Sequence, residues 1–251
     1  LTFTSSNWDS AQTITVTGVD DDAVDGSQNS TITLAVVDGS SDDNFDSLSD
    51  QTVTAANADN DSAGFTVAQS SGSTSVAESG STDTFTVVLD AEPASDVVIS
   101  VTSGDTGEAT VSAASLTFTS SNWDSAQTIT VTGVDDDIID GSINTTITLA
   151  VVDGSSDDDF DSLANQTVTA ANADNDSAGF TVTQSSGSTA VAESGSTDTF
   201  TVVLTAEPGS DVVISVTSGD TGEATVSAAS LTFTSSNWDS AQTITVTGVD
   251  D

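Results

Sequence analysis

The segment LTFTSSNWDSAQTITVTGVD, at Leu116–Asp135, decides the fold of this chain. In its second half Ile129 and Val131 alternate with threonines. Strict alternation of apolar and polar residues is typical of a β-strand that turns one face toward a core. The same segment begins at Leu1 and again at Leu231, so the sequence repeats every 115 residues.

A repeat of this length is domain-sized, whereas solenoid repeats have 20–50 residues. Each copy is therefore expected to have its own core. The polar sequence NADNDSAG, at Asn57–Gly64 and Asn172–Gly179, is predicted to link the copies. We expect residues 1–61 to be the C-terminal half of one repeat, 62–176 a complete repeat, and 177–251 the N-terminal part of the next, as a window onto a longer tandem array.

Short alternating runs separated by Gly, Pro, Ser and Asp fill the complete repeat, and no run has a helical period. The candidate strands cover residues 63–69, 74–78, 82–90, 95–103, 108–113, 115–120, 126–135, 144–153 and 166–174. Strands this short and this closely spaced predict an all-β fold, a tandem array of antiparallel immunoglobulin-like β-sandwiches of about 115 residues. Trp123 lies beside such a strand and is expected to pack at a core edge.

The charge of the chain is one-sided: 40 acidic residues, no Lys, Arg or His, and a formal net charge of -40. Two carboxylates about 4 Å apart repel by roughly 1 kcal/mol even in water. Clustered acids therefore need solvation, salt or a bound cation. Nucleic acids and anionic membranes are disfavoured as partners because both bind Lys and Arg. No apolar run approaches the ~20 residues of a membrane span.

Catalysis is not expected. The chain lacks Cys, His, Lys, Arg and Tyr, which supply most general bases, nucleophiles and oxyanion-stabilising groups. A carboxylate pair could serve a glycosidase, but a full active site in every copy of a repeat would be unusual. The lack of Cys also excludes disulfides and thiolate metal sites.

Four groups of acids stand out: Glu78, Asp135–Asp140, Asp153–Asp161, and Asp174 with Asp176. Calcium takes 6–8 oxygen ligands, mainly carboxylates and carbonyls from flexible loops. The alternative is a solvated acidic surface that keeps the protein soluble. For Asp153–Asp161 that alternative is preferred, with a second, weak cation site left open.

A family resemblance reaches the same residues. VTGVDDDIIDGSINTTITLAV, at Val131–Val151, resembles the C-terminal half of a Calx-beta domain, while VAESG and ADNDS resemble that family's early-strand Glu and closing acidic segment. The whole repeat is similar to the tandem Calx-beta-like or immunoglobulin-like repeats of giant calcium-dependent bacterial surface proteins, the extender regions of RTX-type adhesins.

The resemblance implies Ca²⁺ as the bound ion. In the complete repeat the implied ligands are Glu78, Asp105, Asp135, Asp136, Asp137, Asp140, Asp174 and Asp176. In the flanking copies they are Asp20, Asp21, Asp22, Asp25, Asp59, Asp61 and Glu193. The second Glu of the family signature is replaced by Ile143 and, one repeat earlier, by Gln28. This departure removes a ligand, so fewer or weaker ions are expected than in a full site.

These features predict a structural, extracellular rod whose joints calcium stiffens, with neighbouring repeats of the same chain as partners. One alternative is a self-assembling filament, a homopolymer joined by strand exchange or calcium joints. Another is a calcium-dependent binding module, either a sensor or a lectin-like domain. The adhesive target and the number of ions per repeat do not follow from the sequence.

Overall fold

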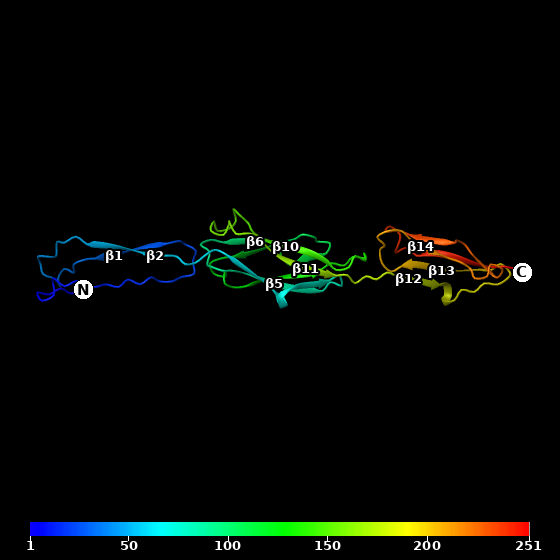
Figure 1. Cartoon of the computed structure of the whole chain (residues 1–251), viewed down its shortest axis with the longest axis horizontal. Helices are drawn as coiled ribbons and strands as arrows, with labels where there is room; N and C mark the ends of the chain where they lie inside the picture. Colours follow the sequence, from blue (N-terminus) through cyan, green and yellow to red (C-terminus); the bar gives the residue numbers. More distant parts are fainter. Residues whose placement is uncertain (251) are drawn as a thin grey trace.

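A computed structural model describes residues 1–250 of the chain. Three β-rich parts lie in a row along the long axis of the molecule (Figure 1). Within the described residues the helical segments are two single 3₁₀ turns, η1 (Ser70–Gly72) and η2 (Ser185–Gly187). A search of the same residues finds no helix with the length and apolar character needed to cross a membrane.

The central part is a sandwich of two sheets. The four-stranded sheet has the order β3-β5-β9-β7. Its strands are β3 (Phe65–Gln69), β5 (Thr82–Leu89), β7 (Ala109–Val111) and β9 (Gln127–Gly133). The five-stranded sheet has the order β4-β11-β10-β6-β8. Its strands are β4 (Thr74–Ala77), β6 (Val97–Ser103), β8 (Ser115–Phe118), β10 (Ile143–Val151) and β11 (Gln166–Ala173).

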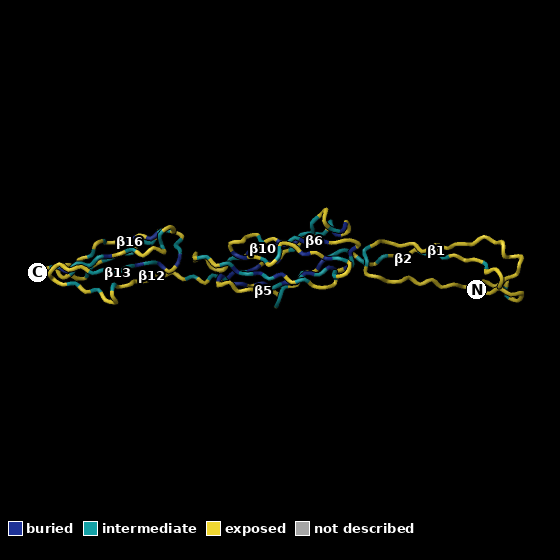
Figure 2. The backbone as a smooth tube through the Cα atoms, turned by 180° about the vertical axis from the view of Figure 1, so that it is seen from behind, coloured by how far each residue is buried: buried dark blue, intermediate teal, exposed yellow. Residues whose placement is uncertain are grey.

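Alternation places the core between the sheets. Phe85 and Val87 of β5, with Ile129 and Val131 of β9, are fully buried, and Phe85 is the register partner of Ile129. The buried residues concentrate along the middle of this part (Figure 2). Trp123 is half-buried and packs against the core, as its position beside a strand predicted.

One strand pair is parallel. β4 lies beside β11 with Thr74 opposite Ala170 and Ala77 opposite Ala173, while the other strand pairs of the sandwich are antiparallel. This pairing brings the end of an early strand next to the end of the last strand. The acids that follow the two strands therefore lie close together.

The acidic loop 153–161 belongs to the packing of the sandwich. Phe160 is fully buried in the core. Asp157 is almost as buried, and its Oδ2 accepts the backbone N–H of Ser95 at 2.8 Å. A buried carboxylate bonded to backbone in this way fixes the loop. The loop is thus more than a solvated acidic run.

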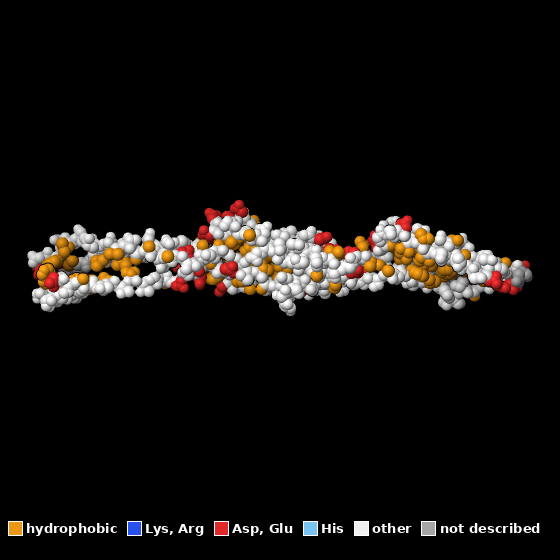
Figure 3. Space-filling view, in the orientation of Figure 1, with side chains coloured by type: hydrophobic (Ala, Val, Ile, Leu, Met, Phe, Trp, Pro, Cys, Tyr) orange, Lys and Arg blue, Asp and Glu red, His pale blue; other side chains and the backbone are white. Residues whose placement is uncertain are grey.

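The two outer parts contain fewer strands. The first is the hairpin of β1 (Gln28–Leu34) and β2 (Gln51–Asn57). The last has the sheet β12-β13-β17-β15 and a separate pair, β14-β16. Its strands are β12 (Phe180–Gln184), β13 (Thr197–Leu204), β14 (Val212–Ser215), β15 (Ala224–Val226), β16 (Ser230–Phe233) and β17 (Gln242–Gly248). Apolar side chains gather openly on both outer parts (Figure 3).

Neighbouring parts contact each other through the loop that follows the acidic run. The backbone N–H of Glu207 donates to the carbonyl of Asp137 at 2.7 Å. One repeat earlier, Glu92 donates to the carbonyl of Asp22 at 2.7 Å, and Val24 packs against the core of the central part. Both joints use the same positions of the repeat, so the joint is a property of the repeated sequence.

The chain is all-β and forms tandem antiparallel sandwiches of the immunoglobulin-like, Calx-beta-like class, as the sequence predicted. The limits proposed for the repeats, at residues 61–62 and 176–177, remain a prediction.

Candidate metal centre

Glu78 is the most buried acid of the chain. It follows β4 and is 1% exposed. Its Oε2 accepts the backbone N–H of Asn175 at 3.0 Å. Within residues 1–250 its buried Oε1 has no hydrogen-bond partner. An isolated carboxylate oxygen in such a place is costly unless something positive or a donor satisfies it.

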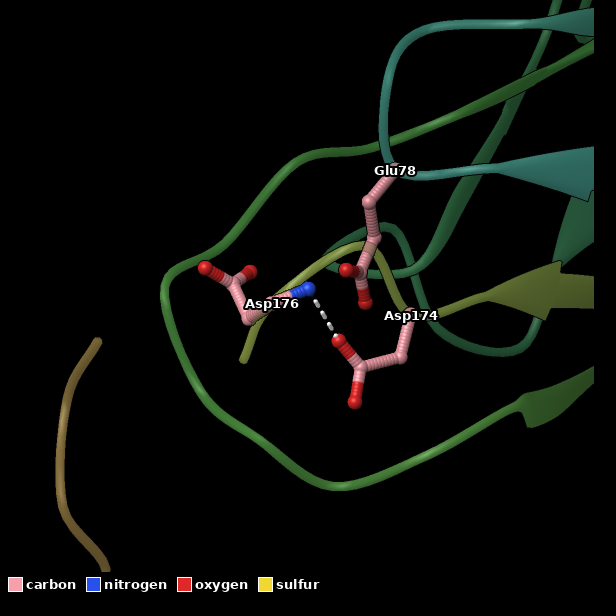
Figure 4. Close-up of side chains that lie close together, drawn as sticks. All are labelled: Glu78, Asp174 and Asp176. Carbon is pink, nitrogen blue, oxygen red and sulfur yellow. Dashed lines mark hydrogen bonds between the residues drawn. The ribbon is translucent and has the colours of Figure 1, made fainter. Parts of the chain in front are cut away.

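Two further carboxylates come within reach of Glu78. Asp174 and Asp176 follow β11 and offer oxygens that, with one oxygen of Glu78, all lie within 4.8 Å of one another. Asp174 and Glu78 lie side by side, and the backbone N–H of Asp176 donates to Asp174 Oδ1 at 2.6 Å (Figure 4). One oxygen of Asp176 is also buried without a partner within the described residues.

A second group of acids brings in a residue that the sequence did not single out. Glu108, Asp136 and Asp140 also offer oxygens within 4.8 Å of one another. Glu108 is buried, and its Oε2 accepts the side-chain N–H of Asn172 at 3.1 Å. Asp140 is tied toward the first group because the N–H of Gly141, its neighbour, donates to Asp174 Oδ2 at 2.8 Å.

A glycine makes this assembly possible. Gly133 ends β9 and lies against the end of β4, where a Cβ would meet the carbonyl of Ala77 and approach Asn172 Oδ1 to 2.7 Å. Such contacts are too close for a real Cβ. The strand end that leads into the acidic run can therefore approach Glu78 only with Gly at this position.

The pKa values follow from burial and crowding. Burial raises the pKa of Glu78, and nearby Asp174, Asp136 and Asp140 add to the rise, against the opposing N–H of Asn175. Burial also raises the pKa of Asp176, with repulsion from neighbouring acids. The N–H groups of Asp176 and Gly141 instead lower the pKa of Asp174. Both elevated values arise from negative charges that lack a counter-charge.

The remaining predicted ligands lie around these groups or away from them. Asp135 accepts the side-chain N–H of Asn175 at 2.9 Å at the rim. Asp137 is exposed and contributes its carbonyl to the joint. Asp105 lies in a turn, where its carboxylate accepts the N–H of Gly107 at 2.9 Å, and it belongs to neither group.

The flanking copies hold partial versions of the site. In the first part Asp20, Asp21, Asp25, Asp59 and Asp61 line a cavity of about 220 Å³, and Asp22 is exposed in the same loop. Asp59 accepts the N–H of Gly26 at 2.8 Å, as Asp174 accepts that of Gly141. In the last part Glu193 is exposed and lines a hollow with Glu223. These two are the repeat counterparts of Glu78 and Glu108.

The arrangement suits a hard cation. Carboxylates converge from the ends of β4 and β11, from the turn before β7 and from the loop after β9, and oxygen ligands from several segments are what Ca²⁺ prefers. Metal binding by these residues remains a prediction.

Comparisons with known proteins give no family assignment: no protein-family model matches the chain, and no curated protein matches it. The chain is similar in structure to the apo form of the CBD1 domain of Calx, at 15% identity and a TM-score of 0.32, over 45% of this chain and 98% of that one.

Two further solved structures are similar. Domains 4–9 of the surface layer protein SbsC match at 18% identity and a TM-score of 0.32, over 82% of this chain and 30% of that one. SSP-19, an MSP-domain protein of Caenorhabditis elegans, matches at 15% identity and a TM-score of 0.28, over 41% and 92%. The account of this chain therefore rests on its own strand pairing and side chains.

Proposed function

We propose that this chain is a structural extracellular repeat protein, a calcium-stabilised rod or extender of a bacterial surface adhesin or fibre. The observation that carries the proposal is Glu78, a buried carboxylate with an unpartnered oxygen that faces Asp174 and Asp176 in a chain without one basic side chain. A cation from solution is the available means of balancing that charge.

The position of the site supports a mechanical role. The loop that carries Asp136 and Asp140 also carries Asp137, whose carbonyl binds the next part of the chain. An ion that fixes this loop would therefore fix the joint as well. The same joint contacts recur one repeat earlier, which is the geometry of a stiff tandem array.

Linkage gives the expected size of the effect. An ion that binds only the folded state stabilises it by about 2.7 kcal/mol at a hundred times Kd. Extracellular calcium modules have Kd values around 10⁻⁴–10⁻³ M. For a domain of about 100 residues this stabilisation corresponds to a rise in Tm of roughly 10 °C or more.

The test is thermal unfolding of the full chain in EDTA, in millimolar CaCl₂ and in equal MgCl₂ at constant ionic strength. We expect a calcium-specific rise in Tm that Asp136→Asn largely removes. Asp96→Asn is the matched control, because Asp96 is exposed and outside both groups of acids. An equal response to magnesium, or an equal loss in the two variants, would reduce the acids to a solvated surface.

A further inference from the structure

The two ends of the chain expose apolar residues that are buried in the central part. Val53 is 54% exposed, whereas its repeat counterpart Val168 is 1% exposed. Phe180 is 56% exposed, whereas its counterpart Phe65 is 5% exposed. The local sequences are nearly the same, so the difference lies in the strands that cover them.

The last part lacks two specific strands. Its β14–β16 pair corresponds to β6–β8, which in the central part belong to a sheet completed by β10, β11 and β4. β14 ends at Ser215, while β6 continues to Ser103 by pairing with β10. Residues 189–192, the counterpart of β4, form no strand, since β4 is held by β11.

The first part carries those two strands. β1 and β2 are the repeat counterparts of β10 and β11, and they pair in the same register, with Gln28 opposite Asn57 as Ile143 is opposite Asn172. The hairpin is thus already formed in the geometry that the central sandwich uses. Its inward face is open along Val53.

We propose that the β1–β2 hairpin of one copy of this chain completes the last part of a second copy. The hairpin inserts between β14 and residues 189–192, and the copies join head to tail. The central part supplies the register: Leu149 opposite Val101 becomes Leu34 opposite Val216. Residues 1–20 repeat β16 and β17, whose places are filled, and so stay outside the completed sandwich.

The junction also completes a split metal centre, a point that rests on the proposed function. Glu193 and Glu223 of the receiving copy occupy the positions of Glu78 and Glu108. The incoming copy supplies the counterparts of the Asp ligands, namely Asp21, Asp25, Asp59 and Asp61. Each copy carries a net charge of -40, so association needs screening salt or the bridging ion.

Engineered cysteines test the register, since the chain has no Cys. Thr148 pairs with Thr102, which places Thr33 of one copy opposite Thr217 of another at a separation that a disulfide can span. Thr33 and Thr217 lie at opposite ends of the rod (Figure 1). On oxidation in calcium and salt, the full chain with Thr33→Cys and Thr217→Cys should form a covalent ladder of oligomers. Thr33→Cys with Thr183→Cys, on the other sheet, should not.

A charge placed on the hairpin tests the apolar contact. Val53→Asp should abolish the ladder, because the aspartate would be buried without a partner. Thr54→Asp adds the same charge to the outward face and should leave the ladder intact, since its counterpart Thr169 is exposed. A monomer at all concentrations, or equal ladders from both cysteine pairs, would overturn the proposal.

The calcium dependence separates this proposal from the proposed function. Loss of the ladder while calcium still raises the Tm of the chain would refute the junction and leave the central metal centre standing. A ladder that forms equally in EDTA at high salt would confirm the junction and refute its split metal centre.

Discussion

At the scale of single residues, Glu78 has opposite effects in the two states of the site. With no ion, its buried charge raises its own pKa and destabilises the folded chain at neutral pH. With an ion, the same burial makes the carboxylate a strong ligand because little water competes. A group whose folded pKa is raised favours folding more as the pH falls, which is the reverse of an ordinary paired acid.

Glu78→Gln should therefore invert with calcium. The amide keeps an oxygen for the N–H of Asn175 and removes the unpaired charge. In EDTA at pH 7 we expect the variant to unfold at the same Tm as the parent chain or above it. In millimolar calcium it should unfold roughly 10 °C below the parent. Differential scanning calorimetry decides, and a lower Tm in both conditions would mean that Glu78 serves packing alone.

Asp83 should respond to pH in the ordinary direction. The hydroxyl of Ser70 and then the N–H groups of Ser75 and Thr84 lower its pKa below the usual 3.8. Its carboxylate thus stabilises the fold above that value and loses the contribution as the pH falls through its lower folded pKa. Asp83→Asn should lower Tm at pH 7, and the deficit should shrink below about pH 4. A deficit that is constant with pH would show that charge plays no part.

The residues of the site were only partly predictable. The sequence pattern selected Glu78, Asp136, Asp140, Asp174 and Asp176, because each follows an alternating run or lies in an acidic segment. Glu108 was missed, since its approach depends on the pairing of β7 with β9 rather than on any local signal. The same turn was noticed through Asp105, whose carboxylate instead binds its own backbone.

At the scale of elements, the end of β9 decides whether the acids meet. Gly133→Ala should lower Tm and weaken calcium binding together, because the strand must move away from Ala77. Gly209→Ala is the control: an added Cβ there meets nothing within 4 Å. Parallel unfolding and calcium titrations check both variants. Full retention of calcium affinity in Gly133→Ala would separate the strand end from the site.

Strand pairing marks the limit of the sequence at this scale. Alternation in residues 74–78 and 166–174 predicted two strands but not that β4 and β11 lie parallel to each other. Period-two patterning tells which face of a strand is buried and leaves its neighbour open. The pairing is what carries Glu78 to the acids after β11.

At the scale of the whole molecule, the joints should couple ion binding to shape. Without calcium, repulsion among the acids after β9 should loosen the loop that holds Glu207. Small-angle X-ray scattering at constant ionic strength and low protein concentration should show a larger average radius of gyration in calcium than in EDTA. Identical profiles would mean that the joints are stiff, or loose, whatever the ion.

The repeat made the overall plan readable from the sequence. A 115-residue period and short alternating runs were enough for tandem sandwiches. The joint was not readable, because its contacts are made by backbone groups of Asp137 and Glu207, which leave no pattern in the side chains.

The central claim is that carboxylates around Glu78 bind calcium, and isothermal titration calorimetry of the full chain tests it most directly. We predict a calcium-specific binding heat with Kd around 10⁻⁴–10⁻³ M, which magnesium does not reproduce and which Glu78→Gln reduces by the central site. A titration with no binding heat, or one that Glu78→Gln leaves unchanged, would contradict the claim.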